Sequence, residues 1–98
     1  MWGWFDAREA KAFGEDTARK FMARVPLDKR WTDKQFAAKS RHAMQALEVD
    51  LTEFRRERSL NTYKIAQMGN QFKWTLVEAG YDRSYVDDLT HWLVRTVS

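Results

Sequence analysis

The stretch that most constrains the fold is NTYKIAQMGNQFKWTLVEAG, residues 61–80. At 100° per residue, the rotation of an α-helix, its apolar side chains fall on two separate stripes. A helix that is apolar over more than half of its circumference is normally central in a bundle or covered at a subunit contact. The stretch therefore predicts a bundle of helices rather than an isolated helix.

The two stripes differ in composition. The first holds Ile65, Met68, Gly69, Phe72, Leu76 and Ala79. The second holds Tyr63, Ala66, Trp74 and Val77, with Asn70 among them. We expect the first stripe to pack inside the chain, with Gly69 allowing a neighbouring helix to approach closely. The second stripe is aromatic but contains an amide, which is typical of an interface and rare in a dry core.

A first helix is predicted over residues 5–25. Its early acidic side chains and late basic ones suit the helix dipole, and Pro26 ends it because proline lacks the N–H of the hydrogen-bond ladder. Its core face is predicted to contain Ala10, Phe13, Gly14, Thr17, Phe21 and Val25.

A second helix is predicted over residues 33–58. Thr32 and Gln35 have the spacing of a capping box, in which each side chain bonds the backbone of the other residue. The apolar positions that follow span an arc of about 100°, which indicates ordinary core packing. These positions are Phe36, Ser40, Ala43, Met44, Leu47, Leu51 and Phe54.

The proline-free segment 33–79 leaves two alternatives, one helix or two. One unbroken helix would be ~70 Å long, whereas a compact domain of this size is only ~30 Å across. Ser59, Asn61 and Thr62 favour helix caps over helix interiors. We therefore predict a break there and a third helix over residues 61–79.

A fourth helix is predicted over residues 84–97, beginning at Ser84 or Asp82. Gly80 before it has the position of a C-terminal glycine cap, with Tyr81 folding back onto the last turn of the third helix. The apolar face of the fourth helix contains Tyr85, Val86, Leu89, Trp92, Leu93 and Val97. The predicted fold is all-α, an up-and-down bundle of three to four helices in a single helical domain over residues 1–98.

Composition narrows the class of protein. A chain of 98 residues without cysteine has one domain and neither disulfides nor thiolate metal sites. The net charge of +3 is spread along the chain, whereas a dedicated nucleic-acid binder usually has a basic face or arm. The sequence shows neither a signal peptide nor an apolar run of the ~20 residues that span a bilayer. We expect a cytoplasmic protein.

Residues 75–92 resemble the spacing of a DNA-binding helix-turn-helix. The second of its helices carries Asp87 and Asp88 on the outward side, where phosphates would repel them. An ordinary helical hairpin is the favoured interpretation, and nucleic-acid binding through this element stays an alternative.

Metal binding and catalysis have little support in the sequence. Asp88 and His91 stand one turn apart, but a metal site in a bundle needs two such pairs and further carboxylates. There is no phosphate-binding glycine motif, and no serine or threonine has a recognisable base partner. We predict no catalytic residue, metal or cofactor, and no small-molecule substrate.

The N-terminus carries three large aromatic side chains, Trp2, Trp4 and Phe5. They are predicted either to dock on the bundle or to contact a partner protein or a membrane interface. The acidic residues that follow them disfavour an anionic membrane.

These patterns predict a small non-enzymatic interaction module that self-associates, as a homodimer, through its third and fourth helices. The predicted contact residues are Tyr63, Ala66, Asn70, Trp74, Val77, Trp2, Trp4 and Phe5. The alternatives are a nucleic-acid-binding helical domain and a peripheral accessory subunit docked through its N-terminal aromatics.

Overall fold

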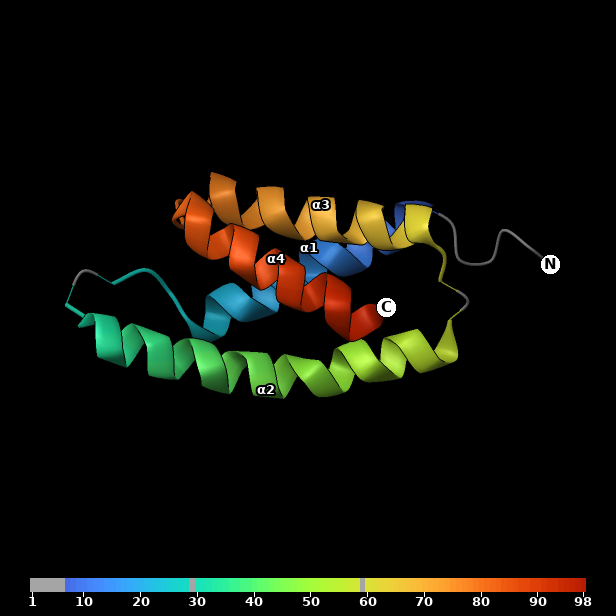
Figure 1. The fold of residues 1–98 in the computed structure, drawn as a ribbon. Coiled ribbons are helices and arrows are strands. Elements are labelled where there is room, and N and C mark those ends of the chain that lie inside the picture. Colours follow the sequence, from blue (N-terminus) through green and yellow to red (C-terminus); the bar gives the residue numbers. More distant parts are fainter. Residues whose placement is uncertain (1–6, 29, 59) are drawn as a thin grey trace.

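The structure, a computed structural model, describes residues 7–28, 30–58 and 60–98, and within these ranges the chain forms four helices and no strand (Figure 1). They are α1 (Ala7–Arg24), α2 (Asp33–Glu57), α3 (Thr62–Glu78) and α4 (Arg83–Val97). Successive helices run in opposite directions, so that α1 and α3 point one way and α2 and α4 the other (Figure 1). The predicted all-α up-and-down bundle is confirmed. The N-terminal residues Trp2, Trp4 and Phe5 lie outside the described residues.

Each helix packs on two neighbours. Helix α1 packs on α3 and α2, and α4 packs on α3 and α2, so that α2 and α3 lie on opposite sides of the bundle (Figure 1). The bundle measures 50 × 24 × 18 Å, with α2 as its longest helix. Helix α3 is therefore covered on the sides that face α1 and α4, and no other described helix packs on its remaining side.

Local capping signals set the helix ends. Thr32 Oγ1 accepts a hydrogen bond from the Gln35 N–H at 3.1 Å, and Gln35 Oε1 accepts one from the Thr32 N–H at 3.0 Å. The predicted break is confirmed: Asn61 caps α3 by accepting from the Lys64 N–H at 2.8 Å. The N-cap of α4 is Asp82, the second of the two candidates, and its carboxylate accepts from the Tyr85 N–H at 3.0 Å.

The turn from α3 to α4 depends on Gly80, whose φ of 104° lies in the left-handed region that favours glycine. The Gly80 N–H donates to the Val77 carbonyl at 3.0 Å, and the Tyr81 N–H donates to the Leu76 carbonyl at 3.1 Å. This pair of bonds is the Schellman motif, which closes the helix and reverses the chain. Ala79, predicted on the buried stripe, is instead the exposed C-cap of α3.

The first stripe of α3 lies in the core, where Met68, Phe72 and Leu76 are fully buried. Every residue predicted for the core face of α1 is buried except Phe13, which is half-buried and stacks on Phe54 of α2 with ring centroids 3.7 Å apart. Among the described residues, the buried apolar side chains form one cluster with members from all four helices. A single core therefore holds the bundle together.

Two glycines allow helices to approach closely. A Cβ atom built on Gly14 would overlap the carbonyl oxygen of Met68 and lie 3.1 Å from its carbonyl carbon, so α1 crosses α3 at backbone contact. A Cβ on Gly69 would lie 3.1 Å from Val94 Cγ2 and 3.6 Å from Thr90 Cγ2 of α4. The prediction that Gly69 accommodates a neighbouring helix is confirmed, and that helix is α4.

Two tyrosine hydroxyls form hydrogen bonds to residues that are far away in the sequence. Tyr81 Oη donates to the Val25 carbonyl at 2.5 Å, and the hydroxyls of Tyr85 and Ser40 are hydrogen-bonded to each other. Burial raises the pKa of Tyr81, and the neighbouring Tyr85 raises it further. Burial also raises the pKa of Tyr85, while its hydrogen bond with Ser40 opposes part of that rise.

These pKa shifts predict a loss of stability in alkali. The unfolded chain loses its tyrosine protons near pH ~10, whereas the folded chain holds them to higher pH. The contribution of these two tyrosines to the free energy of unfolding should therefore be constant below this pH and fall as the pH rises towards the folded pKa values. Urea midpoints measured at pH ~8 and ~11 should differ less in Tyr85→Phe than in the wild-type chain. Tyr63→Phe is the matched control, since its ring is exposed, and an equal alkaline loss in all three chains would contradict the assignment.

Candidate interaction surface

The five described residues of the second stripe of α3 lie together along one side of the helix. Tyr63 is 62% exposed and Trp74 38% exposed, Ala66 and Asn70 are exposed, and Val77 is half-buried against the core. We call these five residues the outer stripe. Within the described part of the chain, the large exposed apolar residues are Leu27, Val49, Tyr63 and Trp74, so α3 carries two of them. The outer stripe is thus the apolar side of α3 that the described helices leave partly exposed.

Trp74 is held in one orientation by its neighbours. Its indole Nε1–H donates to Asn70 Oδ1 at 3.0 Å, a bond that the four-residue spacing on a helix permits. The Lys73 ammonium lies 5.4 Å and the Arg83 guanidinium carbon 4.9 Å from the ring centroid, within the range of cation–π attraction. The carbonyl oxygen of Asn70 therefore has a partner within the chain, and the indole stands fixed beside two cations.

Helix α4 borders one edge of the outer stripe. Lys73 Nζ lies 3.2 Å from Asp87 Oδ1, an ion pair that ties the two helices together. Asp88, His91 and Arg95 are exposed on α4. The acidic pair Asp87 and Asp88 lies where a recognition helix would need cations, which weighs against DNA binding through residues 75–92.

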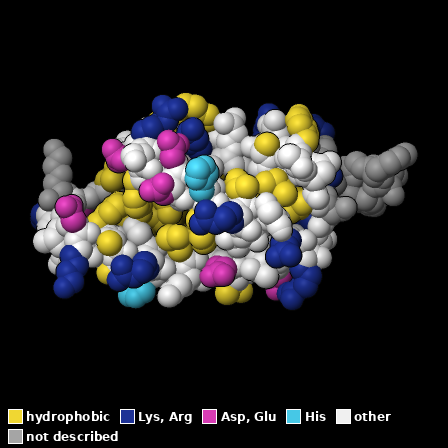
Figure 2. All heavy atoms as spheres, in the orientation of Figure 1, with side chains coloured by type: hydrophobic (Ala, Val, Ile, Leu, Met, Phe, Trp, Pro, Cys, Tyr) yellow, Lys and Arg dark blue, Asp and Glu magenta, His cyan; other side chains and the backbone are white. Residues whose placement is uncertain are grey.

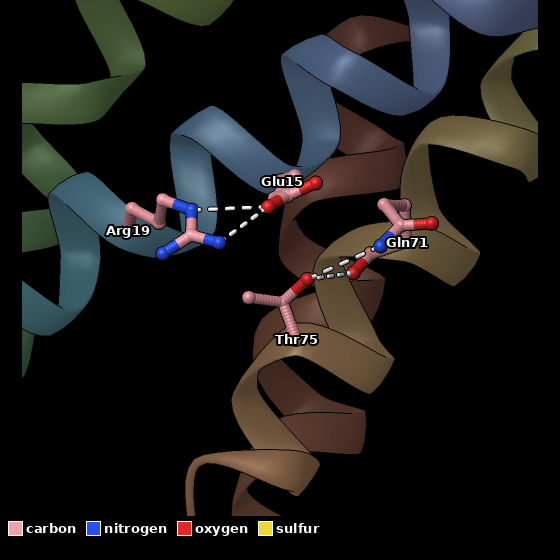
Figure 3. A network of polar contacts seen from close by, with 4 residues as sticks. All are labelled: Glu15, Arg19, Gln71 and Thr75. Carbon is pink, nitrogen blue, oxygen red and sulfur yellow. Dashed lines mark hydrogen bonds and ion pairs between the residues drawn. The ribbon is translucent and has the colours of Figure 1, made fainter.

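The other edge of the outer stripe, towards α1, is polar. Figure 3 shows two pairs on these neighbouring helices, Glu15 with Arg19 on α1 and Gln71 with Thr75 on α3. Arg19 binds the Glu15 carboxylate at 2.5 and 3.1 Å, and Thr75 Oγ1 donates to the Gln71 carbonyl at 2.7 Å. The exposed ion pair of Glu15 and Arg19 adds little stability. The two polar pairs limit the apolar surface to the side of α3 that adjoins α4.

A second apolar surface, which the sequence reasoning missed, lies at the start of α2. Trp31 precedes the N-cap, and its ring centroid lies 6.3 Å from that of Phe36, which in turn lies 4.9 Å from Tyr85 of α4. Trp31 and Phe36 occupy the two positions of a hydrophobic staple, so the W-T-D-K-Q-F order was the available signal. These side chains and Leu27 line an open groove of about 400 Å³. Figure 2 shows apolar side chains gathered between α4 and α2 towards this end of the bundle.

Charges surround the mouth of this groove. Asp28 and Asp33 also line it, and Lys39 Nζ lies 4.7 Å from the Trp31 ring centroid. Asp28 accepts hydrogen bonds from the Arg30 side chain at 3.0 and 3.1 Å, which lower the pKa of the Asp28 carboxyl. The two residues of the hydrophobic staple at the start of α2 thus form part of the lining of this groove.

The described helices include none long and apolar enough to cross a membrane. Over the same part of the chain, no three His, Cys, Asp or Glu side chains come together as a metal site would require. Comparison of the chain with protein-family models, with curated proteins and with solved structures finds no match.

Proposed function

We propose that this chain is a small non-enzymatic interaction module that self-associates through the surface formed by α3 and α4. The observation that carries the proposal is the outer stripe, an apolar surface with two aromatic side chains that the described helices leave partly exposed. Tryptophan and tyrosine are the side chains that most often dominate the energy of protein interfaces. Their exposure on α3, the most apolar of the four described helices, supports a role for this surface in binding protein.

The fixed orientation of Trp74 supports the same proposal. Ordering a large side chain on binding costs free energy, and a side chain that is already held avoids much of this cost. Asn70, Lys73 and Arg83 hold the indole before any partner arrives. Trp74 is therefore the expected anchor of the contact, and Tyr63 a second aromatic contact three helical turns away.

The test is the substitution Trp74→Arg. A glutamate at this position would pair with Lys73 and Arg83, whereas an arginine adds a third positive charge and removes the anchor. Loss of an interface anchor weakens binding by ~2 kcal/mol or more, about 30-fold in the dissociation constant. Light scattering coupled to size exclusion should show a wild-type dimer at a concentration where Trp74→Arg is a monomer of equal helicity.

Val49→Arg is the matched control for this experiment. Val49 is 66% exposed on α2, away from the outer stripe, and its replacement should leave the dimer intact. A wild-type chain that stays monomeric at high micromolar concentration would contradict self-association. A Trp74→Arg chain that loses its helicity would assign the indole to the folding of the monomer instead.

The two alternatives predict different results. Binding to duplex DNA that weakens steeply with salt would support nucleic-acid recognition. A monomeric chain that copurifies with a defined complex would support the accessory-subunit alternative.

A further inference from the structure

The outer stripe and the exposed side of α4 form one continuous surface. Gly69 faces Thr90 and Val94, since a Cβ atom built on it would lie within 3.6 Å of a methyl carbon of each. The residues that follow Gly69 and Thr90, namely Asn70 and His91, are both exposed. The helices run in opposite directions, and the Lys73–Asp87 ion pair lies one turn further along the same seam. Asn70 and His91 therefore lie level with each other on the same side of the bundle. We call the outer stripe with Asp88, His91 and Arg95 the α3–α4 face.

The apolar residues of this face are arranged symmetrically about Asn70. Tyr63 and Val77 each lie seven residues from Asn70, and Ala66 and Trp74 each lie four residues from it. If two copies of α3 met antiparallel with Asn70 at the centre, the large Trp74 of one copy would lie level with the small Ala66 of the other. Large side chains opposite small ones allow two apolar surfaces to pack without voids.

On α4, two residues of opposite charge lie at nearly equal distances on either side of His91. Asp88 precedes His91 by three residues, and Arg95 follows it by four. A two-fold axis at the level of His91 would place Asp88 of each copy beside Arg95 of the other, giving two ion pairs. A parallel arrangement would instead place Asp88 against Asp88 and Arg95 against Arg95, where like charges repel.

We infer that the partner of the α3–α4 face is a second copy of this chain, docked antiparallel about a two-fold axis that passes at the level of Asn70 and His91. The inference rests on the proposed function and specifies its partner and register. Isologous two-fold contacts of this kind are the commonest form of self-association. The contact buries the outer stripe and pairs Asp88 of each copy with Arg95 of the other.

Cysteine cross-linking tests the register, and the absence of native cysteine makes each introduced thiol unique. A disulfide requires Cα atoms within about 7 Å. Asn70→Cys lies at the axis and should form a disulfide-linked dimer under mild oxidation, seen on a non-reducing gel. Tyr63→Cys lies seven residues from the axis, so its two copies would be ~21 Å apart along the helices. It should not link to itself but should link to Val77→Cys when the two variants are mixed.

A charge exchange tests the contribution of α4. Asp88→Lys and Arg95→Glu should each weaken dimerisation roughly tenfold, because two exposed ion pairs per dimer become repulsive. The double variant should recover the wild-type dissociation constant, because each lysine then meets a glutamate of the other copy.

Each outcome separates this inference from the proposed function. If wild-type chain dimerises in light scattering but Tyr63→Cys links to itself, or Asn70→Cys does not link, the antiparallel register is wrong while self-association stands. If the double charge variant dimerises as weakly as the single variants, the proposed pairing of Asp88 with Arg95 is wrong while self-association stands. If the wild-type chain is monomeric, the proposed self-association is wrong, and the register inferred from it is wrong as well. Val49→Cys on α2 is the control for random collision and should stay unlinked.

Discussion

Replacing Phe72 by alanine is expected to lower the free energy of unfolding by about 3–5 kcal/mol, the range for emptying a buried phenylalanine site. The Phe72 side chain is fully buried. It lies on the first stripe of α3 between Met68 and Leu76, which are also fully buried. Since α3 contacts both α1 and α4 from this stripe, the surrounding helices cannot close the cavity without moving apart from other contacts. Domains of this size are stabilised by only ~5–15 kcal/mol in total, so the variant should be partly unfolded at physiological temperature.

Urea denaturation followed by circular dichroism measures this loss. Val49→Ala is the control, because it removes an exposed apolar side chain from α2, outside the proposed contact. It should cost less than ~1 kcal/mol, as surface substitutions usually do. An equally small loss for Phe72→Ala would mean that α3 is not central to the core and would overturn the packing described above.

The substitution Gly14→Ala is expected to destabilise the chain by about 2–3 kcal/mol or more, although a glycine-to-alanine change normally favours a helix. The new methyl group would overlap the Met68 carbonyl. Backbone atoms of a neighbouring helix cannot rotate aside as a side chain can, so α1 and α3 would have to separate along their contact. This separation would loosen the closest helix pair of the bundle and expose part of its core.

Gly69→Ala is the matched comparison for this prediction. Its Cβ would meet the end of the Val94 side chain at 3.1 Å, which a small rotation of that side chain relieves. The gain in helix propensity, up to ~1 kcal/mol, should offset the remaining strain. Thermal melts should therefore show a clear fall in the midpoint for Gly14→Ala and a small change for Gly69→Ala. Equal midpoints for the two variants would mean that α1 and α3 can separate at little cost.

Much of the local structure could be predicted from the sequence because its determinants lie within one helical turn of each other. The capping box of Thr32 and Gln35, the Asn61 cap and the glycine turn at Gly80 each depend on residues one to four positions apart. The 3.6-residue period likewise assigned the buried stripe of α3 and the core faces of its neighbours. For the same reason the members of the outer stripe were predictable, since a helix places them on one side whatever surrounds it.

The packing of the helices depends on contacts between residues far apart in the chain, which local patterns do not specify. The way the helices cross determines three contacts that join distant segments. Gly14 faces the Met68 backbone, Tyr81 is hydrogen-bonded to Val25, and Tyr85 is hydrogen-bonded to Ser40. The pairing of α3 with α1 and α4 buries the first stripe, as predicted, and leaves the outer stripe partly exposed. Arg83 reaches Trp74 because the turn at Gly80 brings the start of α4 back against α3. Periodicity shows that a side of a helix is apolar, but only the positions of the other helices show whether that side is covered.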